Sequence, residues 1–226
     1  MSTASDTLRK PSTFIPVSRT LYSTFLAVLF LSEVDCMEVS RIRYAAQQGD
    51  PQAQFKLGTM YAVGQGVHQD KDQALRWLRL ASVDGSADVL YKIGIMYANG
   101  KGIPRDYVLA SRYYREAANQ GHSNAETELG LLYFSGIGVP QDYTHALLIL
   151  RNAAKRGNTR ARLKIGEMYA EGRGVPRDVV RAHVWSNLAG AQGDRQALTY
   201  RDMLTAKMTT EELFKAQELA RNWQFH

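Results

Sequence analysis

Apolar residues recur three or four positions apart through most of the chain, a spacing that predicts amphipathic helices. In AQFKLGTMYAVG, which begins at Ala53, the residues Ala53, Leu57, Met60 and Tyr61 fall on one side of such a helix. A second block of the same kind follows a short loop, and its apolar positions are Ala74, Trp77, Leu78 and Ala81. The pattern therefore predicts pairs of helices joined by a loop.

The loop between the two blocks is rich in glycine and occurs four times. Its copies are YAVGQGVHQD at 61–70, YANGKGIPRD at 97–106, YFSGIGVPQD at 133–142 and YAEGRGVPRD at 169–178, each 36 residues after the last. A glycine loop that cradles a phosphate is needed once, between a strand and a helix. No alternating strand pattern precedes these loops. We therefore interpret the glycines as structural parts of a repeat.

Several residues of each unit have an expected mechanical role. Gly58 lies within a predicted helix, where glycine costs about 1 kcal/mol relative to alanine, so we expect a neighbouring helix to approach it closely. Gly64 and Gly66 are expected to end the helix and turn the chain. Asp70 is expected to cap the next helix. The later equivalents are Gly94, Gly130 and Gly166 within the helix, and Asp106, Asp142 and Asp178 at the cap.

The shared positions, A-x-x-x-L-G-x-x-Y-x-x-G-x-G-V-x-x-D-x-x-x-A and then A-A-x-x-G, resemble the Sel-1-like repeat of the tetratricopeptide class. The resemblance implies an all-α, right-handed α-solenoid of about four 36-residue helix–loop–helix repeats. The expected divisions are a half-repeat N-terminal cap at 37–52, repeats at 53–88, 89–124, 125–160 and 161–196, and C-terminal capping helices at 197–226. Thr209 and Glu212 have the spacing of a capping box, which predicts where the last helix begins.

The first 36 residues differ from the repeats. Residues 1–20 are polar with some basic residues, and LYSTFLAVLFL at 21–31 is apolar. This stretch is short for a membrane-spanning helix but suits the core of an export signal. We therefore expect residues 1–36 to be a signal peptide or membrane anchor, and the protein to be exported, either periplasmic or secreted. An inner-membrane anchored or cytoplasmic protein, a mitochondrial leader and lipidation of Cys36 remain alternatives.

Composition and charge point to no catalytic chemistry. The net charge is +6, but no run of Lys and Arg stands out, so nucleic acid is not an expected partner. None of the five histidines has a second histidine three or four residues away, as a helical metal site needs. The single cysteine, Cys36, has no thiol partner. The sequence thus predicts no enzyme, no cofactor and no metal.

In stacked helical hairpins the first helices line an extended concave surface. By analogy with tetratricopeptide repeats, we assign to it positions that vary between units while core positions do not. The predicted partner-binding groove residues are Phe55, Thr59, Tyr91, Ile95, Asn99, Leu131, Phe134, Leu163 and Glu167. The apolar members would form a stripe, with Lys56, Lys92 and Lys164 as a basic rim. The alternative that some, especially Phe55 and Tyr91, are partly buried between hairpins stays open.

The resemblance implies a non-enzymatic scaffold or adaptor that binds a protein or peptide in the concave groove. Envelope assembly, signalling regulation and host interaction are the roles it suggests. A monomer is expected, with membrane contact only through the N-terminal segment. Two other classes remain open: a peptidoglycan- or glycan-associated binding protein or enzyme, and a self-associating structural protein.

Overall fold

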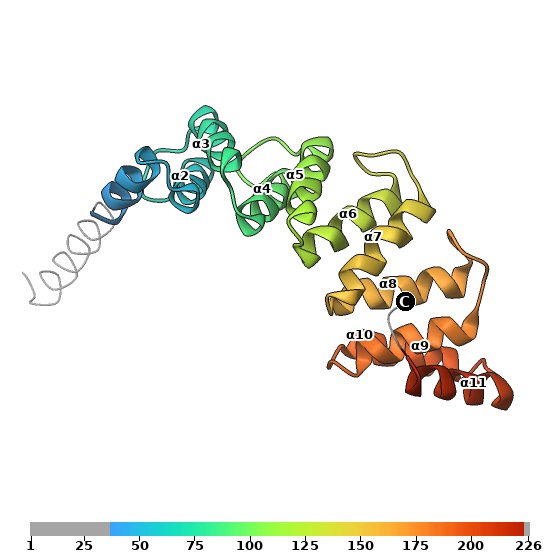
Figure 1. Cartoon of the computed structure of the whole chain (residues 1–226). Coiled ribbons are helices and arrows are strands. Elements are labelled where there is room, and N and C mark those ends of the chain that lie inside the picture. Colours follow the sequence, from blue (N-terminus) through green and yellow to red (C-terminus); the bar gives the residue numbers. More distant parts are fainter. Residues whose placement is uncertain (1–36, 224–226) are drawn as a thin grey trace, which may run out of the picture.

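The computed structural model describes residues 37–223, and the chain runs through them as an arc of paired helices (Figure 1). Residues 37–47 are helical. The helices that follow are α2 (Pro51–Val63), α3 (Lys71–Val83), α4 (Ala87–Asn99), α5 (Tyr107–Asn119), α6 (Ser123–Ser135), α7 (Tyr143–Lys155), α8 (Thr159–Glu171), α9 (Val179–Gly190), α10 (Arg195–Thr205) and α11 (Thr210–Arg221). The expectations for residues 1–36, including Cys36, lie outside the described residues. Across residues 37–223, no helix has the length and apolar character to cross a membrane.

The helices pack as four hairpins followed by a closing pair. α2 packs on α3, α4 on α5, α6 on α7 and α8 on α9, while α10 and α11 both pack on α9. In Figure 1, α2 and α4 lie on the inner side of the arc, and α8 and α10 do so in its C-terminal half. The predicted all-α stack of helix–loop–helix repeats is therefore confirmed.

Each second helix begins at the aspartate that the sequence assigns to its cap. Asp106 Oδ1 accepts hydrogen bonds of 2.9 Å from the backbone N–H groups of Val108 and Leu109. The side chain of Asp70 also accepts two backbone hydrogen bonds at the start of α3, and those of Asp142 and Asp178 each accept one at the starts of α7 and α9. These bonds satisfy amide groups that the first turn of a helix leaves without a partner.

The first helix of each repeat begins two residues before the repeat boundary predicted from the sequence. These helices start at Pro51, Ala87, Ser123 and Thr159. Their N-cap residues are Asp50, Ser86, His122 and Asn158. The cap residue differs from copy to copy, but each one directly follows the glycine that closes the preceding unit. At the other end of the chain, Thr209 and Glu212 form the predicted capping box.

Two glycines show why each repeat needs residues without side chains. A Cβ atom on Gly94, within α4, would lie 2.6 Å from the ring of Tyr114 on α5, so the predicted close approach of the two helices is confirmed. Gly102, in the loop, has a φ of +75°, and a Cβ atom there would lie 2.0 Å from the carbonyl oxygen of Ala62. The first glycine lets a hairpin close, and the second lets its loop rest on the preceding repeat.

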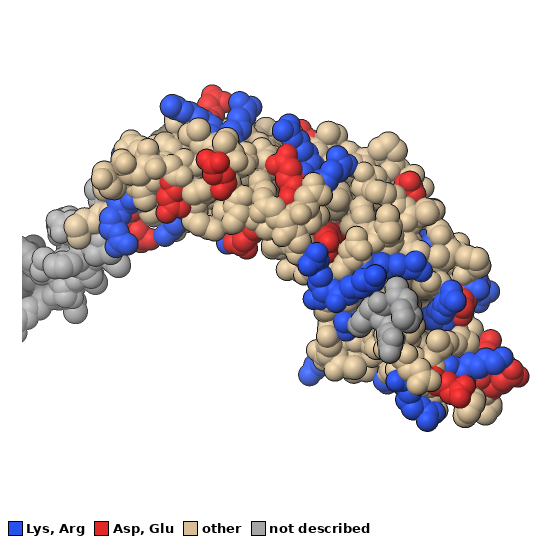
Figure 2. Space-filling view, in the orientation of Figure 1, with Lys and Arg blue, Asp and Glu red and all other residues tan. Residues whose placement is uncertain are grey.

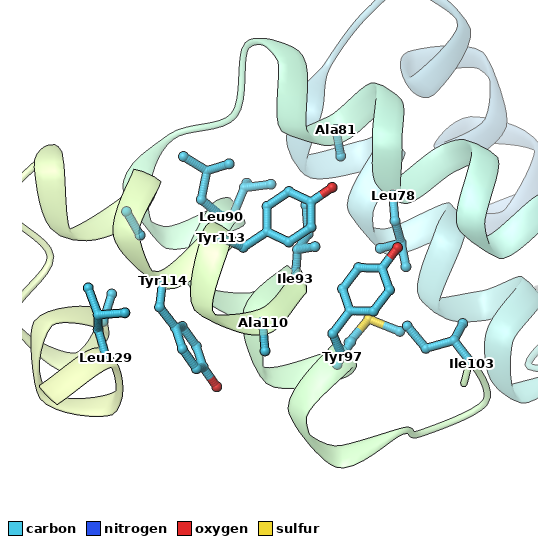
Figure 3. Close-up of a cluster of buried hydrophobic side chains, with 14 of the residues drawn as sticks. Leu78, Ala81, Leu90, Ile93, Tyr97, Ile103, Ala110, Tyr113, Tyr114 and Leu129 are labelled. Carbon is cyan, nitrogen blue, oxygen red and sulfur yellow. The ribbon is translucent and has the colours of Figure 1, made fainter. Parts of the chain in front are cut away.

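The core runs from one repeat into the next without a break. In the cluster drawn in Figure 3, Leu78 of α3, Ile93 of α4 and Ala110 of α5 are fully buried or nearly so. The rings of Tyr97 and Tyr113 stack with centroids 5.6 Å apart and planes 9° apart. Because the cluster takes side chains from successive hairpins, each repeat completes its core only when its neighbour is in place.

Candidate functional site: the concave face

Consecutive first helices contact one another and so form one continuous surface. The Thr59 hydroxyl of α2 lies 3.5 Å from Met96 Sδ of α4. On the next pairs, the Tyr91 ring lies 4.4 Å from the His122 ring, and Arg160 of α8 pairs with Glu128 of α6. We call the exposed surface of α2, α4, α6 and α8 the concave face, since the arc curves toward it.

A groove of about 890 Å³ lies at the N-terminal end of the concave face. We call it the N-terminal groove. Its walls come from residues 37–47, from α2, and from Lys92 of α4. Two predicted groove residues, Phe55 and Thr59, line it, and both are half-buried. The Thr59 hydroxyl donates a hydrogen bond of 3.0 Å to the Phe55 carbonyl, which satisfies its polar group within the helix.

The middle of the face holds three more predicted residues with different surroundings. Tyr91 is half-buried at the junction of two repeats, where its ring lies 5.9 Å from Tyr114. Burial raises the pKa of the Tyr91 hydroxyl, and the Glu128 carboxylate adds to this effect. Ile95 is half-buried and Asn99 is exposed. Tyr91 thus packs the junction, as the alternative interpretation held, whereas Ile95 and Asn99 remain available to a partner.

Phe134 is the centre of a cluster between the third and fourth repeats. The Lys164 ammonium lies 3.8 Å from the centre of its ring, a cation–π distance, and the Arg173 guanidinium lies 5.2 Å from it. Tyr143 meets the same ring edge-on at 5.1 Å. Glu167 receives a hydrogen bond of 2.9 Å from Lys164, so two predicted groove residues, Phe134 and Glu167, share one lysine.

Leu163, expected in the groove, lies instead inside the protein. Its side chain is 5% exposed and packs with Ala189, Ala197 and Tyr200. The reason is its register, since the position faces the start of the next first helix, α10, and not the open surface. The apolar stripe therefore does not continue onto Leu163, and Leu131 and Phe134, both half-buried, are its last members among the predicted residues.

The expected basic rim is a row of ion pairs. Lys56 Nζ lies 2.6 Å from Glu38 Oε1, and Lys92 Nζ lies 2.6 Å from Asp88 Oδ2. Lys164 is paired with Glu167, as described above. Figure 2 shows acidic and basic side chains interspersed over the N-terminal part of the arc, whereas basic side chains gather over its C-terminal half.

Two contributors to this face were missed from the sequence. The helical segment 37–47 forms a wall of the N-terminal groove through Arg41 and Ile42. Arg173 reaches Phe134 from the loop of the fourth repeat, where it lies between the two recurring glycines. A search for positions that recur every 36 residues finds neither, because the segment lies before the first full repeat and the loop position differs in each copy.

The described residues show no arrangement suited to metal chemistry. Across residues 37–223, no group of three His, Cys, Asp or Glu side chains lies close enough to hold a metal ion. Glu126 is buried beside Arg156, with the Arg156 Nε and Glu126 Oε2 atoms 3.5 Å apart. Burial raises the pKa of its carboxyl, although Arg156 opposes this. The pair joins the third repeat's α6 and α7, a structural position.

Stacked helical hairpins with a continuous, partly apolar concave face define a helical-repeat protein of the kind that binds other proteins. The Sel1 repeat family matches residues 51–83, 87–122, 123–158 and 159–194. The chain therefore belongs to the Sel1 repeat family. Repeats of this family typically mediate protein interactions.

Two solved structures are similar over most of the described chain. A protective antigen present in uropathogenic Escherichia coli strains, which displays an SLR fold, is 32% identical with a TM-score of 0.68, and the match covers 82% of this chain and 40% of that one. A Sel1 repeat protein from Oxalobacter formigenes is 37% identical with a TM-score of 0.62, covering 75% and 50%. This chain thus spans half or less of either relative. No curated protein matches it.

Proposed function

We propose that the chain is a non-enzymatic scaffold that holds a protein or peptide partner on its concave face. The observation that carries this proposal is a contrast between positions. The glycines and aspartate caps that shape each repeat recur in every copy, whereas the predicted groove positions, such as Thr59, Ile95, Leu131 and Glu167, change from one repeat to the next. Ile95, Leu131 and Phe134 remain half-exposed there. If the concave face served only to stack one repeat on the next, its residues would be expected to recur as the glycines do.

We propose three settings for such a scaffold: envelope assembly, signalling regulation and host interaction. Each of them relies on proteins that bind other proteins, as Sel1 repeats typically do. The similar antigen of uropathogenic Escherichia coli fits the last of them, although this chain spans 40% of that protein. We also propose that residues 1–36 direct export, since the apolar stretch 21–31 follows a polar and partly basic segment. Fractionation of the native host, with the mass of the mature chain measured, tests export. A chain of full mass in the cytoplasm would overturn it.

Cross-linked capture of partners from the native host tests the scaffold proposal. The test variant is Ile95→Ala/Leu131→Ala/Phe134→Ala. The matched control is Val83→Ala/Val108→Ala/Leu148→Ala, three apolar residues that are 76%, 63% and 58% exposed on the second helices. Circular dichroism checks that both fold. A partner lost from the first variant and kept by the second supports the proposal, and equal capture by all three chains contradicts it.

A further inference from the structure

The floor of the N-terminal groove is apolar and belongs to the buried core. Val39, Ile42 and Met60 form the floor and are each less than a tenth exposed. Phe55 is half-buried beside them, and Met37 is 71% exposed at the rim. A concave apolar surface of this size favours ligands that bring apolar side chains to it, because their burial removes both surfaces from water.

The walls of the same groove carry more positive than negative charge. Arg41, Lys56 and Lys92 line it together with one carboxylate, Glu38. Lys56 donates to Glu38 at 2.6 Å, and this bond, with the nearby charge of Arg41, lowers the pKa of the Glu38 carboxyl. Arg41 forms no ion pair within residues 37–223.

The ion pairs at the wall can exchange. Lys56 and Glu38 have side chains that are 56% and 55% exposed, and those of Lys92 and Asp88 are 44% and 52% exposed. Exposed pairs of this kind contribute little to stability. A carboxylate from a ligand can therefore replace one of these partners at small cost. It also meets the positive charge of Arg41, which is exposed.

We propose that the N-terminal groove binds a segment of a partner protein in which apolar residues are interspersed with Asp or Glu. The apolar residues fit the floor, and the carboxylates fit the wall of Arg41, Lys56 and Lys92. This inference rests on the proposed scaffold function and specifies the chemistry of its partner. Export would remove or anchor residues 1–36, so the occupant is another protein and not the chain's own N-terminal segment.

Fluorescence anisotropy with synthetic peptides tests the chemistry. The probe is a labelled peptide with leucines at helical spacing and glutamates between them, added to the full chain. One control peptide has lysine for every glutamate, and the other has serine for every leucine. The probe should bind at least about tenfold more tightly than either control. Equal binding of the three peptides would overturn the proposal.

Charge reversal in the protein locates the site. Arg41→Glu/Lys56→Glu should weaken binding of the probe by about tenfold or more. Lys71→Glu/Arg76→Glu changes the net charge by the same amount on exposed residues of α3, outside the groove, and should leave binding unchanged. If both variants weaken binding of the probe equally, the attraction comes from the net charge of the protein and not from this groove, and the proposal is wrong.

A photo-cross-linker at position 55 separates the partner from the chain's own segment. Phe55 is replaced by benzoylphenylalanine, which keeps an aromatic side chain in the groove. Cross-linking to the probe supports the proposal, whereas cross-linking to residues 21–36 in the presence of saturating probe overturns it. The scaffold proposal is judged separately by partner capture with the Ile95/Leu131/Phe134 variant. If that variant loses the partner but the probe peptide does not bind the full chain, the proposal about the N-terminal groove fails and the scaffold proposal stands.

Discussion

Arg151 Nη2 donates a hydrogen bond of 2.6 Å to the Tyr169 hydroxyl and so joins the second helix of one repeat to the first helix of the next. Arg115 and Tyr133 make the same contact one repeat earlier, at 2.8 Å. Both pairs are separated by 18 residues in the chain. Tyr133 and Tyr169 occupy the same position of successive repeats, so this recurring tyrosine joins one repeat to the next at both junctions.

Removing this contact should destabilise the stack modestly. Arg151→Ala should lower the free energy of unfolding by about 1–2 kcal/mol, because a hydrogen bond from a charged donor at a half-buried junction is lost. Tyr169→Phe keeps the ring and removes only the hydroxyl, so its effect should be similar. Urea unfolding of both single variants and the double variant measures the coupling. Fully additive losses would show that the two residues do not act through one bond.

Gly102 and Gly157 allow the cost of a close contact to be separated from the cost of backbone strain. Both have positive φ, +75° and +90°, but only Gly102 has a carbonyl oxygen in the path of a Cβ atom. Gly157→Ala should therefore cost roughly 1–2 kcal/mol through strain alone. Gly102→Ala should cost roughly 1–3 kcal/mol more through crowding against Ala62. Thermal unfolding followed by circular dichroism compares them, and equal losses would contradict the contact.

The helix caps provide a second matched pair. Asp106 accepts two backbone hydrogen bonds, so Asp106→Ala should destabilise the protein by about 1 kcal/mol. Ser86 occupies the N-cap of α4 but makes no side-chain cap hydrogen bond, and Ser86→Ala should change stability by less than about 0.5 kcal/mol. Chemical denaturation decides between them. A loss at Ser86 as large as that at Asp106 would mean that the bonds are not the source of stability.

His183 should make the C-terminal end of the stack sensitive to acid. It lies half-buried on α9, with Nε2 3.1 Å from the Thr205 hydroxyl of α10. Burial lowers the pKa of its imidazole below the ordinary 6.5, Arg201 lowers it further, and Asp202 partly opposes them. The unfolded chain therefore takes up a proton before the folded chain does. The contribution of His183 to the free energy of unfolding is therefore full above pH 6.5, and it is lost as the pH falls from 6.5 through the lower pKa of the folded chain.

Unfolding measured between pH 7.5 and 5 checks this sign. His183→Gln should remove part of the decline, because glutamine does not titrate. His68→Gln, at an exposed loop position, is the control and should leave the decline unchanged. An unchanged slope in the His183 variant would refute the assignment.

Much of the local structure could be predicted from the sequence. The helix pairs, the aspartate caps and the glycine that admits Tyr114 follow from rules that act within a few residues or within one hairpin. The starts of the first helices were predicted two residues late, because the residue type at the N-cap, Asp50, Ser86, His122 or Asn158, changes from copy to copy. The concave surface was predicted less well, since the exposure of a position depends on the neighbouring repeat.

The sequence by itself determined that this protein is a stack of helix–loop–helix units, because periodic apolar positions, caps and positive-φ glycines specify each unit locally. Only the tertiary structure decided which side chains the concave face presents. It buried Leu163 against Ala197, and it paired Lys56 with Glu38 from the segment before the first repeat. The physical reason is that both contacts join residues far apart in the chain, and their distances are set by how successive helices pack.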